Sequence, residues 1–147
     1  MLGYYNQPEE TAKVKKDGWF YTGDMAWADE EGYLFFSDRK KDIIVSGGEN
    51  IESREVEEAL YKHPDVFRTA VFGVPDEKWG ERVIAAIVPK EGRRPVLEEV
   101  REFTKQHLSS YKVPKEILIM DQLPESGTGK VQKMALKKIY QDRKETK

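Results

Sequence analysis

Two runs of β-branched and apolar residues limit the fold of this chain more than any other feature of its sequence. Val66–Val74 and Val83–Val88 each have the length and composition of a strand. Pro75 and Gly80 separate the two runs and Pro89 follows the second, so each run ends at a residue that interrupts regular structure. The sequence therefore predicts two strands here.

Helical patterns lie on both sides of these strands. Apolar residues recur at helical spacing over about residues 52–62, which predicts an amphipathic helix that ends before Pro64. Similar spacing predicts helices over residues 97–108 and 131–143, and Ile117–Met120 is predicted as a third strand. The order of the elements from Asp38 onward, with a short strand at residues 43–45, is β-α-β-β-α-β-α. We expect an α+β fold in which helices pack on a small three-stranded sheet.

A run of five charged residues, Asp38–Asp42, divides the chain. Such a run is not expected in a buried strand, so we interpret it as a linker or a solvated corner. Before it, the aromatic-rich segments 19–21 and 33–37 are predicted as strands, and a short helix is expected to begin near Asn6, which would cap it. The predicted organisation is a short β-rich piece over residues 1–37, a connecting segment over 38–42 and a domain over 43–147.

Composition excludes several classes of protein. The 147 residues carry a net charge of −2, which does not suit a general nucleic-acid binder. There is no cysteine and there are two histidines, so disulfides and thiolate metal sites are excluded and no metal site is predicted. No apolar run has membrane-spanning length, and the first residues lack the pattern of a signal peptide. These absences fit a cytoplasmic protein.

The segment Pro124-Glu125-Ser126-Gly127-Thr128-Gly129-Lys130-Val131-Gln132-Lys133 sets one lysine after a glycine-containing turn. Glycine permits positive φ, and a lysine on such a turn is a point charge suited to an anion such as phosphate or carboxylate. A nucleotide-triphosphatase loop does not fit, because Val131 follows the lysine where Ser or Thr is required, and Pro124 stands where the first glycine is required. The alternative for Lys130 is a solvated lysine at the start of a basic tail.

Four segments together resemble the adenylate-forming superfamily, which includes acyl-CoA synthetases, peptide-synthetase adenylation domains and luciferases. The resemblance is strongest to fatty-acyl-CoA and aryl-CoA ligases and covers nearly the whole chain. The segments are Gly3–Thr11, Gly18–Asp24, Asp38–Ile51 and Pro124–Lys133, in the order that the family has them. The family's phosphate-binding loop and acyl pocket have no counterpart here, which implies the C-terminal part of such an enzyme.

The resemblance implies a reaction in two halves. A carboxylate attacks the α-phosphate of ATP to give an acyl-adenylate, and the thiol of CoA then displaces AMP. Lys130 takes the family's position for the lysine that contacts both the carboxylate and the α-phosphate. Asp24 and Arg39 take the positions of two ribose contacts. Their alternatives are a turn residue for Asp24 and, for Arg39, a surface ion pair with a neighbouring aspartate.

The same resemblance implies a moving domain. Lys41 falls at the family's hinge position, about which residues 43–147 would rotate between the two halves of the reaction. Gly47, Gly48 and Glu49 would then face the active site, with the glycines allowing close approach of the CoA pantetheine arm. Lys112 is the candidate contact for a CoA phosphate, with a surface lysine as its alternative. Trp79, like the other two tryptophans, is interpreted as a packing residue.

The leading hypothesis is the C-terminal fragment of an ATP-dependent acyl-CoA synthetase, with a fatty acid as the carboxylic acid substrate. ATP, CoA and Mg²⁺ would be used by the full-length enzyme, and the partner would be its own N-terminal domain. The fragment alone is predicted to be inactive, because it lacks the phosphate loop and the acyl pocket. Two alternatives remain: a peptide-synthetase adenylation domain, and a non-catalytic module that binds phosphate or nucleic acid.

Overall fold

The computed structural model describes residues 1–145, which form two compact units. The first unit is Met1–Lys41 and the second begins at Asp42. The division between them falls inside the predicted connecting segment.

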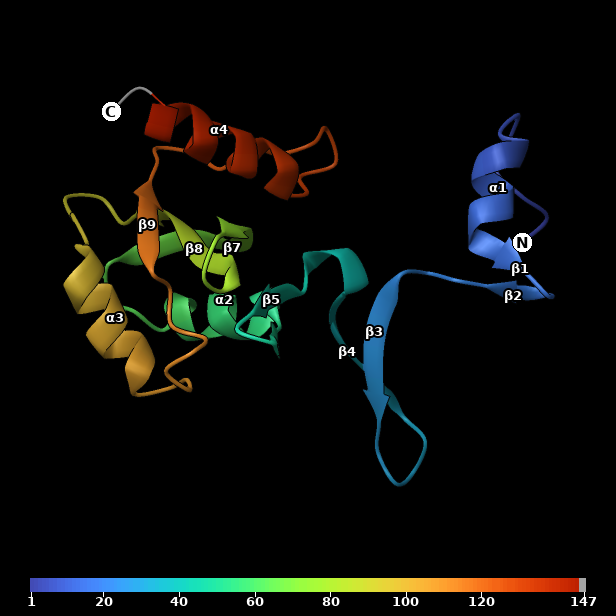
Figure 1. The fold of residues 1–147 in the computed structure, drawn as a ribbon, viewed down its shortest axis with the longest axis horizontal. Helices are drawn as coiled ribbons and strands as arrows, with labels where there is room; N and C mark the ends of the chain where they lie inside the picture. The colour runs from blue at the N-terminus through green and yellow to red at the C-terminus, as the bar shows by residue number, and fades with distance from the viewer. Residues whose placement is uncertain (146–147) are drawn as a thin grey trace. The chain divides into compact units, whose positions relative to one another are not determined.

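A mixed sheet forms the centre of the second unit (Figure 1). β7 (Val66–Asp76) and β8 (Gly80–Pro89) pair as a long antiparallel hairpin. β9 (Glu116–Ile119) runs parallel to β8 on its other side, with Ala85 opposite Ile117. β5 (Ile44–Ser46) also pairs with β8, next to Gly80, and β6 (Glu49–Ile51) pairs with β5.

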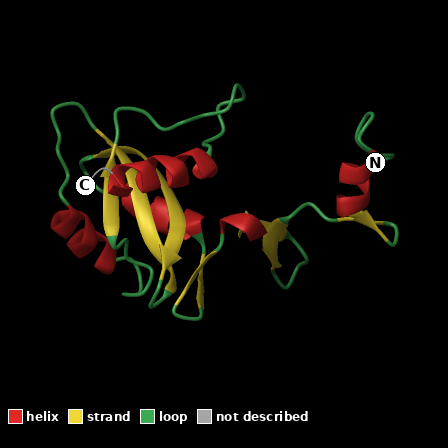
Figure 2. Cartoon of the chain, turned by 45° about the horizontal axis from the view of Figure 1, so that its top comes forward, coloured by secondary structure: helices red, strands yellow, loops and turns green. Residues whose placement is uncertain are grey.

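Helices cover both faces of this sheet, as Figure 2 shows, and the alternation of β8 explains why. Its odd-numbered residues belong to a core shared with α2 (Ser53–Tyr61) and α3 (Leu97–Lys105). Its even-numbered residues belong to a second core shared with α4 (Lys133–Glu145). Because successive side chains of a strand point to opposite faces, a run that is apolar throughout needs apolar cover on both. Residues 83–88 have that cover.

The α+β class is confirmed, but the sheet has five strands and not the expected three. The short strand expected at residues 43–45 is β5, which joins the sheet, and β6 was not predicted. Gly47 and Gly48 form the two-residue turn between β5 and β6 with φ values of 62° and 85°. Two consecutive positive φ values are typical of the tight hairpin turns that match strand twist, and glycine reaches them at least cost.

The expected solvation of the whole run Asp38–Asp42 is wrong for its first residue. β4 (Leu34–Arg39) continues through Asp38, whose side chain is buried with 5% exposure, and only Lys40–Asp42 form a separate short 3-10 turn. The Asp38 carboxylate accepts a hydrogen bond from the backbone N–H of Arg39 at 2.7 Å. A partner for the carboxylate allows a charged residue to be buried at the end of a strand.

The first unit consists of short elements. α1 (Pro8–Val14) precedes the pair β1 (Lys15–Lys16) and β2 (Trp19–Phe20), and β3 (Asp24–Ala28) pairs with β4. The predicted cap at Asn6 is wrong, because Asn6 has a φ of 51° and Gln7 is the residue that caps the helix, without a side-chain hydrogen bond. No apolar residue of residues 1–41 is buried, and the aromatic side chains of β2, β3 and β4 are exposed.

Candidate functional site

Asp24 and Arg39 lie side by side at one end of the β3–β4 pair. They are cross-strand partners, and the Nε of Arg39 is 3.8 Å from a carboxylate oxygen of Asp24. Both side chains are a little under half exposed and line a cleft of about 490 Å³ together with Thr22, Gly23 and Lys40–Lys41. The structure therefore brings together three residues selected from the sequence, Asp24, Arg39 and Lys41. Arg39 forms an ion pair with Asp24 across the two strands.

The backbone at this cleft is fixed by two hydrogen bonds. Asp24 donates its N–H to the hydroxyl of Thr22 at 3.0 Å, and Lys40 donates its N–H to the carbonyl of Gly23 at 2.9 Å. Gly23 has a φ of 78°, which glycine adopts without strain. A carboxylate and a guanidinium at the mouth of an open cleft can bind hydroxyl groups, because together they supply acceptors and donors.

Lys130 lies on an ordered loop of the second unit. Glu125 and Val131 form a bridge across the base of the loop, and Ser126 and Lys130 are joined by a backbone hydrogen bond of 2.8 Å. Gly129 turns the chain with a φ of 76°. The Lys130 side chain is exposed and makes no ion pair within residues 1–145. A fixed turn therefore presents a free ammonium group to solvent.

Gly47 lies at the mouth of a second cavity, where two hairpin turns meet. The N–H of Gly47 donates to the carbonyl of Trp79 at 2.8 Å, and a Cβ on Gly47 would lie 3.1 Å from the indole ring. The cavity has a volume of about 360 Å³. Its lining includes Gly47, Glu49, Trp79 and Tyr111. Gly48, the other residue of the turn, faces open space.

This cavity is rich in cationic groups that the sequence analysis did not single out. Arg101, Lys105 and Lys115 line it. The Nε of Arg101 is buried and has no hydrogen-bond partner within the described residues, while Lys105 pairs with Glu102. Such a cavity is suited to an anionic ligand with a flat ring, because Trp79 and Tyr111 offer aromatic surfaces beside the charges.

Trp79 is placed by the turn that follows β7. The carboxylate of Asp76 accepts the N–H groups of Lys78 and Trp79, both at 3.0 Å, and also binds the guanidinium of Arg82. The hydrogen bond from Arg82, reinforced by that from Trp79, lowers the pKa of Asp76 below its ordinary value. Trp79 is half exposed and lines the cavity, so it is not a core residue. In the sequence, the position of Trp79 between Lys78 and Gly80 is the one indication that it lies in a turn.

Lys112 is not among the residues that line this cavity. Its ammonium lies 2.5 Å and 2.8 Å from the two carboxylate oxygens of Glu55 on α2, and its side chain is 18% exposed. Hydrogen bonding to Glu55 raises the pKa of Lys112 above its ordinary value. The neighbours Tyr111, Val113 and Lys115 line the cavity instead.

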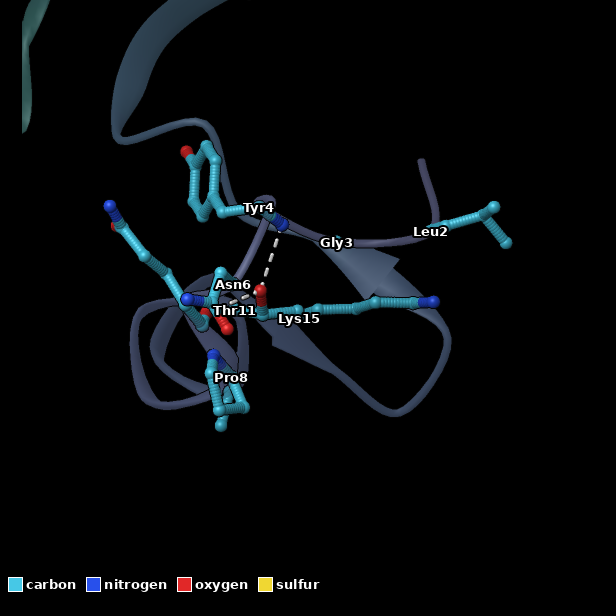
Figure 3. Close-up of a pocket in the computed structure, with 9 residues that line it drawn as sticks. Leu2, Gly3, Tyr4, Asn6, Pro8, Thr11 and Lys15 are labelled. Carbon is cyan, nitrogen blue, oxygen red and sulfur yellow. Dashed lines mark hydrogen bonds between the residues drawn. The ribbon is translucent and has the colours of Figure 1, made fainter.

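A further hollow in the first unit is drawn in Figure 3. It is lined by residues around α1, including Tyr4, Pro8 and Lys15. The hydroxyl of Thr11, another residue of the lining, accepts the N–H of Tyr4 at 2.9 Å and donates to the carbonyl of Gln7 at 2.8 Å. These bonds explain the local shape, and Lys15 is the one charged residue of the lining.

No group of three or more His, Asp or Glu side chains within residues 1–145 is placed to hold a metal ion. Nor is any helix in this part of the chain both long enough and apolar enough to cross a membrane.

The fold and these sites define a class of protein: a small α+β domain that carries an exposed lysine loop and a cationic cavity, preceded by a short β-rich segment. Residues 55–130 match the family described as AMP-binding enzyme C-terminal domain. The chain therefore belongs to this family, whose members are adenylate-forming enzymes.

Known relatives include CoA ligases that act on different acids. The chain is 50% identical to a long-chain-fatty-acid–CoA ligase from Bacillus subtilis, over 89% of this chain and 23% of the relative. It is 46% identical to a feruloyl-CoA synthase from Amycolatopsis, over 95% of this chain and 28% of the relative. An ATP-bound crystal structure of MatB from Rhodopseudomonas palustris superposes with a TM-score of 0.86 at 35% identity, over 95% of this chain and 28% of that one. The chain thus spans about a quarter of the length of these relatives.

Proposed function

We propose that this chain is the C-terminal part of an ATP-dependent acyl-CoA synthetase. A carboxylate oxygen attacks the α-phosphorus of ATP, and pyrophosphate leaves as the acyl-adenylate forms. The sulfur of CoA then attacks the acyl carbon, and AMP leaves as the thioester forms. The observation that carries the proposal is the free Lys130 ammonium on a fixed, exposed loop in a chain of this family.

In the first half of the reaction, Lys130 lies between the substrate carboxylate and the α-phosphate. Two anions repel each other as they approach bonding distance, and a cation between them reduces that repulsion. Asp24 accepts hydrogen bonds from the ribose hydroxyls and Arg39 donates to the same sugar. Their pairing at 3.8 Å supports this, because both side chains reach one open cleft. Mg²⁺ would accompany the phosphates of ATP in the full-length enzyme.

In the second half, the cavity beside Gly47 and Glu49 receives CoA. Arg101, Lys105 and Lys115 supply positive charge for its phosphates, and Trp79 supplies a surface for its adenine ring. The turn Gly47-Gly48 allows the pantetheine arm to pass close to the backbone. The pairing of Lys112 with Glu55 favours a supporting role for this lysine over direct contact with a phosphate.

We infer that the partner of the chain is a larger N-terminal domain of the same cytoplasmic enzyme. Residues 1–37 would belong to that domain, residues 38–42 with Lys41 would form the hinge, and residues 43–147 would move. The absence of buried apolar side chains in residues 1–41 supports the first of these assignments, because exposed aromatic strands need apolar cover. A fatty acid is proposed as the substrate on the similarity to the Bacillus subtilis ligase.

The test is the substitution Lys130→Ala in the full-length enzyme. ATP–pyrophosphate exchange should fall about 10²–10³-fold, the usual effect of losing one fixed group that stabilises developing charge. Thioester formation from added acyl-adenylate should remain. Lys138→Ala is the matched control, because Lys138 is an exposed lysine of α4. Equal loss of both half-reactions would contradict the role given to Lys130.

The 147-residue chain alone should show no ATP–pyrophosphate exchange. The chain offers no counterpart of the family's phosphate-binding loop, so ATP would not be held for attack. Exchange by the purified chain would overturn this part of the proposal.

A further inference from the structure

We propose that helix α2 positions the two working loops of the second unit through two separate carboxylates: Glu57 holds the loop of Lys130, and Glu55 holds the loop that lines the cationic cavity. This inference rests on the proposed function, since it assigns the first loop to adenylate formation and the second to thioester formation.

Glu57 connects α2 to the start of α4. Its carboxylate lies 2.9 Å from the ammonium of Lys133, the first residue of α4, which also donates to the hydroxyl of Ser53 at 2.5 Å. The Lys133 and Glu57 side chains are 18% and 20% exposed. The same Glu57 oxygen accepts the backbone N–H of Val71 at 2.8 Å, so α2, β7 and α4 meet at one carboxylate.

Lys133 follows Lys130 by three residues, so the contact with Glu57 determines where the loop of Lys130 ends. At the other end of the loop, Glu125 forms an ion pair with Arg68 of β7. Each end of the loop is therefore attached to the rest of the second unit by an ion pair. Lys130, between the two ends, makes no ion pair within residues 1–145. A half-buried ion pair holds its two side chains in one orientation, because separating them would leave a charge without a partner.

Glu55 makes the corresponding contact with the other loop. It binds Lys112 through both carboxylate oxygens, and the neighbours of Lys112 in the chain, Tyr111 and Val113, line the cationic cavity. The ammonium of Lys112 also lies over the ring of Tyr111, 5.7 Å from its centre, so the same lysine contacts both α2 and a residue of the cavity lining. Loss of this pair should thus disturb the cavity and leave the loop of Lys130 in place.

The helix can hold two loops because its residues i and i+2 point about 200° apart around its axis. Val56, between the two glutamates, is fully buried and with Leu60 fixes α2 against the sheet. The carboxylates of Glu55 and Glu57 therefore extend from different sides of a helix that is fixed against the sheet. Glu58 provides an internal comparison, since its ion pair is with Arg54 of the same helix and reaches no loop.

The experiment compares Glu57→Gln, Glu55→Gln and Glu58→Gln in the full-length enzyme, with each half-reaction measured separately. Glu57→Gln should lower kcat for ATP–pyrophosphate exchange about ten- to hundredfold, the effect of misplacing a reacting group by a fraction of an ångström to one ångström. It should leave KM for ATP and thioester formation from added acyl-adenylate near wild type. Glu55→Gln should do the reverse, with a raised KM for CoA and normal exchange. Glu58→Gln should change neither.

Substitution of the partner lysine separates positioning from a general loss of folding. Lys133→Met should reproduce Glu57→Gln, and Lys133→Arg, which keeps the charge, should retain most of the exchange activity. Equal loss of both half-reactions in Glu57→Gln, or values equal to those of Glu58→Gln, would overturn the inference. Lys130→Ala is measured in parallel: normal exchange in that variant would overturn the proposed function itself, whereas impaired exchange with an unaffected Glu57→Gln would overturn only the role of α2.

Discussion

Glu116, at the start of β9, connects β8 to α4. Its carboxylate accepts the hydroxyl of Tyr140 at 2.7 Å and the guanidinium of Arg82 at 2.5 Å, and it lies 3.4 Å from the ammonium of Lys144. Partial burial alone would raise the pKa of Glu116. The hydrogen bonds from Tyr140 and Arg82 and the charge of Lys144 outweigh that effect, so the pKa lies below its ordinary value of 4.5.

The substitution Glu116→Gln should therefore destabilise the 147-residue chain in a pH-dependent way. A lowered folded-state pKa means that the charge contributes fully above pH 4.5 and that the contribution is lost as pH falls through the folded-state pKa. We expect a loss of about 1 kcal/mol at neutral pH, because the side chain is one-third exposed and its ion pairs are screened. Urea unfolding at several pH values checks this. A difference between variant and wild type that does not shrink in acid would contradict it.

Single residues differ in how far their surroundings could be predicted. The glycine turn before Lys130 indicated a presented lysine, and its side chain is exposed without an ion pair in the described chain. Lys112 looked equally available in the sequence, yet it pairs with Glu55, 57 residues earlier. Arg101 and Trp79 also join one cavity from distant segments. Residue spacing in the sequence gives no information about contacts between distant segments, so these partners could not be predicted.

At the scale of elements, the sequence pattern was a good guide to the long segments and missed some of the short strands. The helix expected over residues 52–62 is α2 at Ser53–Tyr61, and the two β-branched runs are β7 and β8. The strand expected at residues 43–45 is β5 at Ile44–Ser46, whereas β6 was not predicted, because its three residues are too few to show an alternation. The pairing of β5 with β6 depends on the turn between them, and a Gly-Gly pair permits several turn types.

The β5–β6 turn allows a comparison of two adjacent glycines. Gly48→Ala should cost about 1–2 kcal/mol of unfolding free energy from its positive φ alone, because a Cβ there meets open space. Gly47→Ala should cost a similar amount and also displace Trp79, whose ring would lie 3.1 Å from the new Cβ. The Trp79 indole N–H signal in an NMR spectrum should therefore shift in Gly47→Ala and stay near its position in Gly48→Ala. Equal shifts in both variants would contradict the contact.

At the scale of the whole molecule, the two units differ in what stabilises them. The second unit encloses two apolar cores, one on each face of its sheet. The first unit has backbone pairing in two small sheets and no buried apolar side chain within residues 1–41. Two-stranded pairs without an apolar core are marginal in water. The difference supports the proposed assignment of residues 1–37 to a larger domain.

Hydrogen exchange tests this difference directly. In the 147-residue chain, amides of β7 and β8 should exchange only through global unfolding of the second unit, while amides of β3 and β4 should exchange faster by roughly a hundredfold or more, because local opening there exposes little apolar surface. In the full-length enzyme, the amides of β3 and β4 should slow toward the rates of a buried sheet, since the proposed N-terminal domain would cover their aromatic side chains. The amides of β7 and β8 serve as the control, because their cover lies within the second unit. Equal protection of both units in the 147-residue chain, or unchanged exchange of β3 and β4 in the full-length enzyme, would contradict the assignment.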